Sequence, residues 1–133
     1  MRLHEALYVR TDGRVGHRMI GVPTLLLRTT GRRTGQTRVS ALVYARDGDR
    51  LVMVASNHGF DREPAWFFNL QADPRVNVQV GRARLDGIAS IVEAGDPEYG
   101  RYWTLVNKTN HGRYDAYQTK TARPIPLVVV RPA

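Results

Sequence analysis

The stretch Leu25-Leu-Leu-Arg-Thr-Thr-Gly-Arg-Arg-Thr-Gly-Gln-Thr-Arg38 is an apolar run that breaks into two glycines around a pair of arginines. Gly31 and Gly35 allow backbone conformations that are closed to other residues and let the main chain approach a ligand closely. An apolar strand that stops at such a glycine-rich break is typical of a β-hairpin. The stretch therefore predicts a strand, a tight turn and a second strand.

The same turn carries the guanidinium groups of Arg32, Arg33 and Arg38, which match phosphate and carboxylate oxygens as planar donors. Two interpretations follow: a site for an anion, or an ordinary hairpin turn with solvated arginines. The turn lacks the Lys-Ser/Thr ending of a Walker loop, and no G-x-G-x-x-G follows a strand. These absences argue against a nucleotide triphosphatase and against a Rossmann dehydrogenase.

Outward from this hairpin the chain alternates short strands with few helices. Asp47-Gly-Asp49 is a hairpin turn, Pro64 suits the first turn of a helix, and Asp73-Pro74 ends that helix. The expected strands are 24–28, 39–46, 50–55, 76–80, 83–93 and 125–131, and the expected helices are 64–71, 96–107 and 114–119. This pattern predicts a mainly β fold, a small closed barrel with helices packed outside it.

Composition limits the function classes. The 133 residues suffice for a single domain, and the absence of cysteine excludes disulfides and thiolate chemistry. The four histidines show no metal-ligand spacing, so we expect no metal site. No apolar run is long enough to span a bilayer, and the N-terminus lacks the apolar core of a signal peptide, so we expect a cytoplasmic protein.

The net charge of +8 is concentrated near the N-terminus, where residues 1–40 hold eight arginines against two acidic residues. Such a field attracts nucleic acid, anionic lipid or an acidic cofactor. We expect no nucleic-acid partner, because no aromatic and basic signature such as an RRM box occurs. Peripheral membrane contact remains an expectation.

Three further segments accompany the arginine turn in order: Leu7-Tyr-Val-Arg-Thr-Asp-Gly-Arg-Val-Gly16, then Val54-Ala-Ser-Asn-His-Gly59 with Pro64-Ala-Trp-Phe-Phe-Asn-Leu70, and Tyr114-Asp-Ala-Tyr-Gln-Thr-Lys-Thr-Ala-Arg-Pro-Ile-Pro126. Together they resemble the deazaflavin-dependent nitroreductase family of actinobacteria. The resemblance implies a split β-barrel like that of FMN-binding and pyridoxamine-phosphate-oxidase-like proteins. It covers the chain nearly end to end, so we expect one cofactor-binding domain over residues 1–133, with residues 1–20 as an N-terminal basic segment.

The family resemblance implies coenzyme F-420, a 5-deazaflavin with a phosphodiester and several glutamates in its tail, with FMN as the alternative. By that resemblance the tail lies on the basic turn, and the ring lies at a strand end under a helix. Purely structural roles stay open for three residues of the implied site. Trp66 could pack in the core, Asn69 could be a surface or helix-capping group, and Ser56 could be a hydroxyl at the end of a strand. The cofactor residues implied are Arg32, Arg33, Gly35, Arg38, Ala55, Ser56, Asn57, Trp66 and Asn69.

Two departures from the family pattern concern the ring and the substrate. Many relatives carry Thr-Thr-Pro-Leu where this chain has Val39-Ser-Ala-Leu42, which puts local ring contacts in question. The loop after Asn57 is more charged and bulky, which puts substrate access in question.

The cofactor would carry the hydride, so protein groups need only orient the acceptor and exclude water. Tyr114 and Tyr117 match the family's substrate-side tyrosines, and we expect them and Ser56 to act on the acceptor. Tyr99, Tyr102 and Trp103 are better explained as packing. Each histidine is better explained as a surface group, and His58, inside the ring-binding loop, fits that explanation least well.

The sequence thus predicts a reductase that transfers a hydride from reduced F-420 to a small electron-poor acceptor such as a quinone or nitroaromatic. The alternatives are a non-catalytic module of the same fold that stores the cofactor or binds lipid, and an FMN-dependent reductase. The protein is expected to be a monomer or a homodimer.

Overall fold

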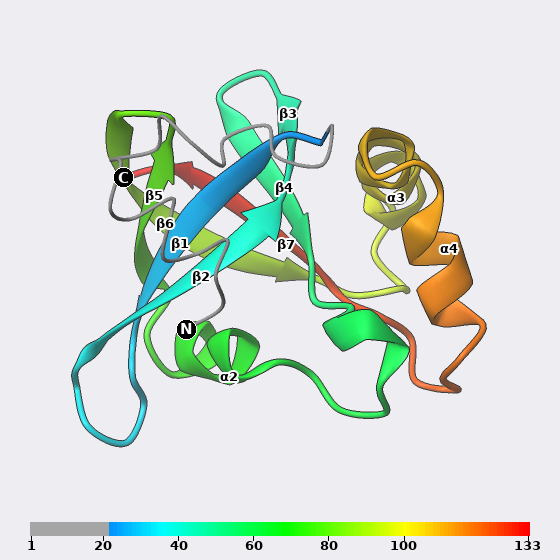
Figure 1. Ribbon diagram of the computed structural model, residues 1–133, viewed down its shortest axis with the longest axis horizontal. Helices are drawn as coiled ribbons and strands as arrows, with labels where there is room; N and C mark the ends of the chain where they lie inside the picture. Colours follow the sequence, from blue (N-terminus) through cyan, green and yellow to red (C-terminus); the bar gives the residue numbers. More distant parts are fainter. Residues whose placement is uncertain (1–21) are drawn as a thin grey trace.

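The computed structural model describes residues 22–133, and its central feature is one antiparallel sheet of seven strands in the order β2-β1-β5-β6-β7-β4-β3 (Figure 1). The N-terminal motif Leu7 to Gly16 and the basic segment 1–20 lie outside the described residues. The strands are β1 (Thr24–Thr30), β2 (Thr37–Val43), β3 (Ala45–Asp47), β4 (Arg50–Val54), β5 (Arg75–Val80), β6 (Ala83–Val92) and β7 (Leu127–Pro132).

The sheet closes on itself because its two edge strands are neighbours in the chain. β2 and β3 stand at opposite ends of the strand order, yet only Tyr44 separates them. Successive Cα atoms are about 3.8 Å apart, so one residue cannot bridge the width of a flat sheet. The sheet therefore curls until the two edges meet, and the Tyr44 N–H donates to the Pro23 carbonyl at 3.3 Å at this junction.

The expectation of one continuous strand over residues 39–46 is wrong. Its first part pairs with β1, where Leu27 lies opposite Ser40, and its last part pairs with β4, where Ala45 lies opposite Val52. The strand must break where it changes partners, and the break is Tyr44. Alternating hydrophobicity carries no information about such a change of partner.

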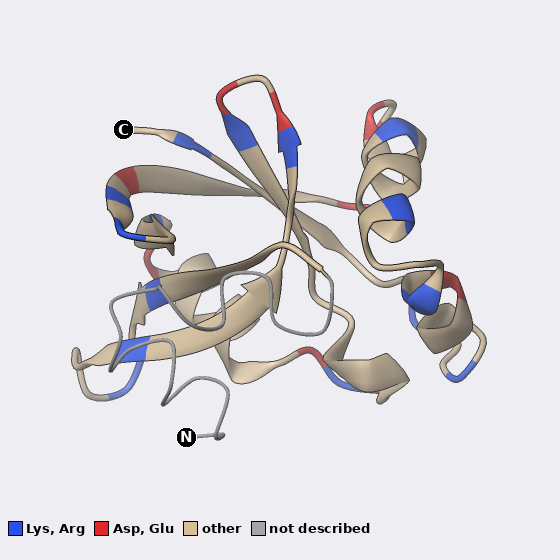
Figure 2. Ribbon diagram, turned by 45° about the horizontal axis from the view of Figure 1, so that its top comes forward, with Lys and Arg blue, Asp and Glu red and all other residues tan. Residues whose placement is uncertain are grey.

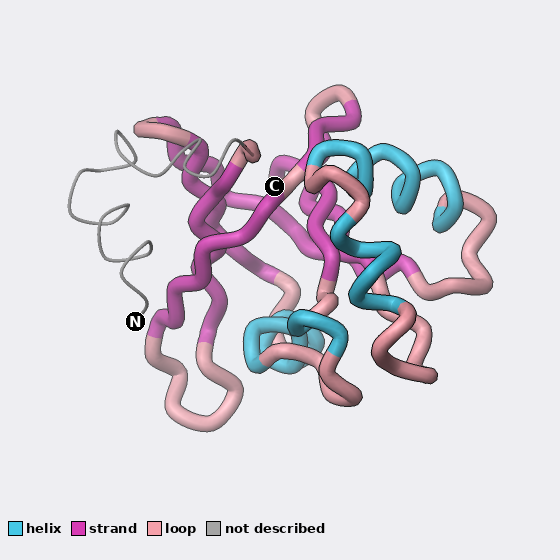
Figure 3. The backbone as a smooth tube through the Cα atoms, turned by 45° about the vertical axis from the view of Figure 1, so that its right-hand side comes forward, coloured by secondary structure: helices cyan, strands magenta, loops and turns pink. Residues whose placement is uncertain are grey.

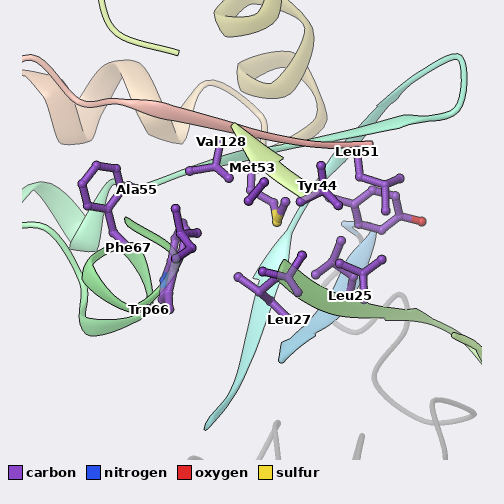
Figure 4. Close-up of a cluster of buried hydrophobic side chains, with 14 residues drawn as sticks. Leu25, Leu27, Tyr44, Leu51, Met53, Ala55, Trp66, Phe67 and Val128 are labelled. Atoms are coloured by element: carbon purple, nitrogen blue, oxygen red, sulfur yellow. The ribbon is translucent and has the colours of Figure 1, made fainter. Parts of the chain in front are cut away.

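Strands β4 and β7 are covered on both faces. Leu51, Met53 and Ala55 point into the barrel with Val128 and Val130 (Figure 4). The alternate residues of the same strands pack on the outer face, against two helices; they are Val52, Val54, Leu127 and Val129. Successive side chains of a strand point to opposite faces, so two covered faces explain the unbroken apolar runs.

The helices occupy two separate places around the barrel (Figures 1 and 3). Helix α2 (Ala65–Ala72) sends Trp66, Phe67 and Leu70 into the interior cluster. Helices α3 (Tyr99–Thr109) and α4 (Arg113–Gln118) cover the outer face of β4 and β7. The predicted mainly β barrel with flanking helices is confirmed. The third helix begins at Tyr99 rather than Asp96, because the Asp96 side chain accepts from the Glu98 N–H in the preceding turn.

We predict that Gly87→Ala in β6 destabilises the barrel, because a Cβ there would lie 2.5 Å from Val130 Cγ1 and 2.9 Å from the Arg131 carbonyl oxygen. Forcing a methyl group into a packed site costs about 1–3 kcal/mol of unfolding free energy. The control is Gly100→Ala in α3, where no neighbouring atom lies within 4 Å; this change should stabilise the helix by about 0.5–1 kcal/mol. Urea denaturation of both variants measures the difference, and equal effects would contradict the packing at Gly87.

Candidate functional site

A cleft of about 400 Å³ opens between β2, the end of β4, the start of α2 and helix α4. It brings together five of the residues expected at the site, from segments far apart in the sequence: Ser56, Asn57, Trp66, Tyr114 and Tyr117. The remaining lining residues are Thr24, Ser40, Ala41, Leu42, Val43, Val54, His58, Pro64, Asn110 and Arg113. Ser40 to Leu42 belong to the stretch that departs from the family pattern, so that departure does fall at the cleft.

The chain turns sharply where β4 ends, in the short helix η2 (Asn57–Gly59). Asn57, His58 and Gly59 have φ angles of 46°, 57° and 82°. This left-handed region costs residues other than glycine about 1–3 kcal/mol each, and such strain clusters at functional sites. Gly59 cannot carry a side chain, because a Cβ would lie 2.6 Å from the Tyr117 carbonyl oxygen on α4. The strained turn is therefore pressed against α4 and places Ser56, Asn57 and His58 along the cleft.

Arg123 binds the backbone carbonyl groups of this turn. Its side chain is 13% exposed and pairs with Glu63, with 3.1 Å between Nη1 and Oε1. Nε donates to the Phe60 carbonyl at 2.8 Å, Nη2 donates to the Ser56 carbonyl at 2.8 Å, and Nη1 donates to the Ala55 carbonyl at 3.3 Å. One guanidinium thus fixes the backbone on both sides of the turn. Arg123 lies within the motif Tyr114 to Pro126, and no local sequence pattern indicated its role.

The two tyrosines of α4 differ in environment. Tyr114 is 4% exposed, and burial, with a smaller contribution from Tyr117, raises its pKa, while a hydrogen bond with Asn110 acts in the opposite direction. Its phenol therefore stays neutral well above physiological pH. Tyr117 is half-buried, and its ring centroid lies 6.1 Å from that of Tyr114 and 5.8 Å from that of His58. Both rings line the cleft.

The other aromatic side chains of α3 pack as expected. Tyr102 is buried in the outer cluster, and the Tyr99 hydroxyl donates to the Ile125 carbonyl at 2.6 Å. The Trp103 indole donates to Asp115 at 2.7 Å. None of the three lines the cleft.

The arginine turn is a hairpin between β1 and β2. The Gly31 N–H donates to the Gln36 carbonyl at 2.7 Å, the Gly35 N–H donates to the Gly31 carbonyl at 2.8 Å, and Gly35 has a φ of 73°. Arg33 and Arg38 are exposed, and the hairpin carries no acidic residue (Figure 2). The segment is thus a β-hairpin with a concentration of positive charge at its tip, and its role as an anion site stays a prediction.

Arg32 is anchored by helix α2. Its backbone N–H and its Nη1 donate to Asn69 Oδ1 at 3.2 and 2.9 Å, and its guanidinium lies 5.3 Å from the centre of the Phe68 ring. The Asn69 amide also donates to Thr29 Oγ1 at 3.3 Å. Asn69 is therefore buried beneath the turn and fixes its position.

Two of the expected cofactor residues have polar groups that already bond within the protein. Ala55 is fully buried below the cleft, and its N–H donates to the Pro126 carbonyl while its carbonyl accepts from Arg123. Its carbonyl oxygen has a second lone pair, so a contact with a ring edge stays a prediction. Asn69 lies in the same way outside the cleft, with its amide committed to Arg32 and Thr29. Trp66 has both of the roles considered, because it belongs to the interior cluster and also lines the cleft.

The chemistry of the site suits an anionic, flat organic molecule. The part of the cleft lining that the structure describes contains aromatic, hydroxyl and amide groups and no carboxylate. Strand β2 runs from Arg38 at the basic turn to Ser40 and Leu42 in the cleft, and α2 connects the same two places through Asn69 and Trp66. Within residues 22–133 no three side chains gather as a metal site would require.

Comparison with known proteins identifies the family. The family model described as F420H(2)-dependent quinone reductase matches residues 1–132. The chain belongs to this family. It is 50% identical over 131 residues to an F420H(2)-dependent quinone reductase of Mycobacterium tuberculosis, covering 98% of this chain and 88% of the relative. A second protein of that organism, named as a putative F420H(2)-dependent quinone reductase, is 33% identical over 111 residues, covering 84% of this chain and 91% of the relative.

Solved structures agree with this assignment. An F420-H2 dependent reductase superposes with a TM-score of 0.74 at 36% identity, covering 82% of this chain and 94% of the other. A domain-swapped dimer superposes with a TM-score of 0.77 at 33% identity, covering 95% and 93%. A pyridoxamine 5'-phosphate oxidase-like protein of Listeria innocua shares the fold alone, at 16% identity, a TM-score of 0.58 and coverage of 98% and 94%. The resemblance to deazaflavin-dependent reductases and the split-barrel fold are confirmed.

The next two properties of this F-420 family member are its relation to the membrane and its oligomeric state. Among the helices that the structure describes, none is long and apolar enough to cross a membrane. Peripheral membrane contact stays a prediction, and so does the choice between monomer and homodimer.

We predict that Arg123→Lys loosens the strained turn, because an ammonium cannot reach all the acceptors that the guanidinium fork satisfies. Losing a charged hydrogen bond costs about 1.5–3 kcal/mol, so the free energy of unfolding should fall by about that amount. Amide hydrogen exchange should accelerate in residues 56–63. The exposed Arg131→Lys on β7 is the matched control, and an equal response in both variants would contradict the assignment.

Proposed function

We propose that the protein is a quinone reductase that uses reduced F-420 as its hydride donor. Family membership and the names of relatives 50% and 33% identical support this. The observation that carries the proposal is the continuity of the aromatic cleft, whose described lining has no carboxylate, with the basic turn along β2 and α2. When bound, the deazaflavin supplies hydride chemistry that no side chain offers.

The basic turn would hold the anionic tail of the coenzyme. Arg33 and Arg38 are exposed, and Arg32 is pre-oriented by Asn69 and Phe68. Guanidinium groups bind phosphate and carboxylate oxygens as bidentate donors. The distance along β2 from Arg38 to Leu42 is about 13 Å at 3.3 Å per residue, which lets one elongated molecule reach from turn to cleft. Gly35 keeps the turn tight enough for this approach.

The cleft would hold the ring system and the acceptor. Ser56 and Asn57 lie at the strained strand end, and Trp66 forms an apolar wall beside them. Tyr114, Tyr117 and Ser56 present hydroxyl groups that can orient a quinone oxygen. Because its phenol is held neutral, Tyr114 would act as a hydrogen-bond donor rather than as an acid. Enclosure by α4 would exclude water from the reacting pair.

The first test is cofactor binding, measured as fluorescence titration with F-420 and with FMN. Arg32→Ala and Arg33→Ala should each weaken F-420 binding by about tenfold or more, because a charge-assisted bond is worth about 1.5–3 kcal/mol. The control is Arg46→Ala, an exposed arginine on β3 beside Tyr44 at the other end of the barrel (Figure 1). Tighter binding of FMN would contradict the proposal, and so would loss of affinity in the control alone.

The second test separates an enzyme from a cofactor-storage or lipid-binding module. Tyr114→Phe and Tyr117→Phe should each lower turnover of menadione with reduced F-420 about two- to tenfold, because a charge-free hydrogen bond to the acceptor contributes about 0.5–1.5 kcal/mol. Cofactor affinity should be unchanged. Tyr102→Phe, outside the cleft, is the control. Binding without turnover in the wild type would favour the module.

A further inference from the structure

The family resemblance gave no role to His58. It lines the cleft and is also exposed to solvent. Its backbone has a φ of 57° and a ψ of 20°, in the left-handed region that residues with a side chain seldom adopt and that Asn, Asp and His adopt more readily than the others. The strain is maintained by Gly59 against α4 and by the bonds of Arg123 to the turn. These contacts hold the His58 imidazole at the solvent-exposed edge of the cleft.

The reduction of a quinone needs a proton as well as a hydride. A hydride brings two electrons and one hydrogen, so the hydroquinone forms only when a second hydrogen arrives as a proton. The described lining of the cleft contains no carboxylic acid, and the guanidinium of Arg113 does not give up its proton. Tyr114 is buried away from solvent, which would supply its replacement proton.

We propose that His58 is the general acid of the reaction, an inference that rests on the quinone reductase function proposed above. The hydride adds to the quinone, and the N–H bond of the His58 imidazolium breaks as an O–H bond forms on the hydroquinone oxygen. The electron pair of the N–H bond stays on the ring, which becomes neutral imidazole. Solvent then returns a proton to the exposed ring.

The surroundings of His58 suit a donor that faces both the cleft and water. From α4 the Tyr117 ring meets the imidazole at a centroid distance of 5.8 Å and an angle of 75°. Within its own loop, Phe60 meets it at 6.3 Å. Both contacts are edge-to-face, and the His58 side chain between them is exposed to solvent.

Several charged or titratable groups face this part of the loop. They are Arg113, Tyr114, Tyr117 and Lys120 from α4 and the segment after it, Asp61, Arg62 and Glu63 from the loop itself, and Arg123 from behind. Side chains of these types ordinarily do not change their charge state between about pH 5 and 8, whereas an imidazole does. A change in rate within that range would therefore report on a histidine.

The test compares His58→Asn with His111→Asn. Asparagine tolerates the left-handed region, so neither variant adds strain. His111 also has a positive φ, 56°, and is exposed, but it lies outside the cleft and is a matched control. Steady-state kinetics with reduced F-420 and menadione are measured from pH 5 to 9, with and without added imidazole, and F-420 affinity is measured by fluorescence.

The expected result is a fall in kcat of about 100-fold at pH 7 for His58→Asn, in line with a lost general acid. The wild-type kcat should decline with rising pH, the variant should lack this decline, and added imidazole should restore part of its rate. F-420 affinity and the control should match the wild type. A His58→Asn variant with the wild-type pH profile and rate would overturn the proposal. A wild type that binds F-420 but reduces no quinone would instead overturn the proposed function, and the proton donor with it.

Discussion

The single-residue connection at Tyr44 is the constraint on which the rest of the structure depends. It ties the two outermost strands of the sheet together, so the sheet must curl, and the curled sheet encloses the interior cluster. The same connection leaves β2 and the end of β4 facing one another without forming a ladder. The cleft lies at this discontinuity, lined by Ser40 to Val43 on one side and by Val54 and Ser56 on the other.

The geometry of the cleft also depends on how the turn after β4 is held in place. A strand end with three successive left-handed residues would not hold its shape alone. Arg123 satisfies its carbonyl groups from one side, and α4 meets Gly59 from the other. Backbone strain, the partly buried Arg123 guanidinium and a short helix therefore act together. Each is modest in isolation, and together they position Ser56, Asn57 and His58.

Local sequence signals predicted the elements well and the contacts between them less well. Turn residues such as Asp47-Gly-Asp49 and apolar runs such as Leu51 to Ala55 predicted most strands, because both act over a few residues. The break at Tyr44 and the clamp by Arg123 depend on partners far away in the sequence, which no periodicity reports. For the site, motif resemblance selected five residues that do line the cleft, and it did not indicate that the polar groups of Ala55 and Asn69 bond to Pro126, Arg123 and Arg32 inside the protein.

Because the cleft lies between β2 and β4, binding of a ligand there would also affect the stability of the folded barrel. A molecule bound in the cleft would contact both β2 and the end of β4, two edges that form no ladder with each other in the described part of the chain. A ligand that binds only the folded state adds about 2.7 kcal/mol at a concentration 100 times its dissociation constant. The abundance of the folded protein would then follow the supply of its coenzyme, and a cell short of that coenzyme would turn the protein over faster.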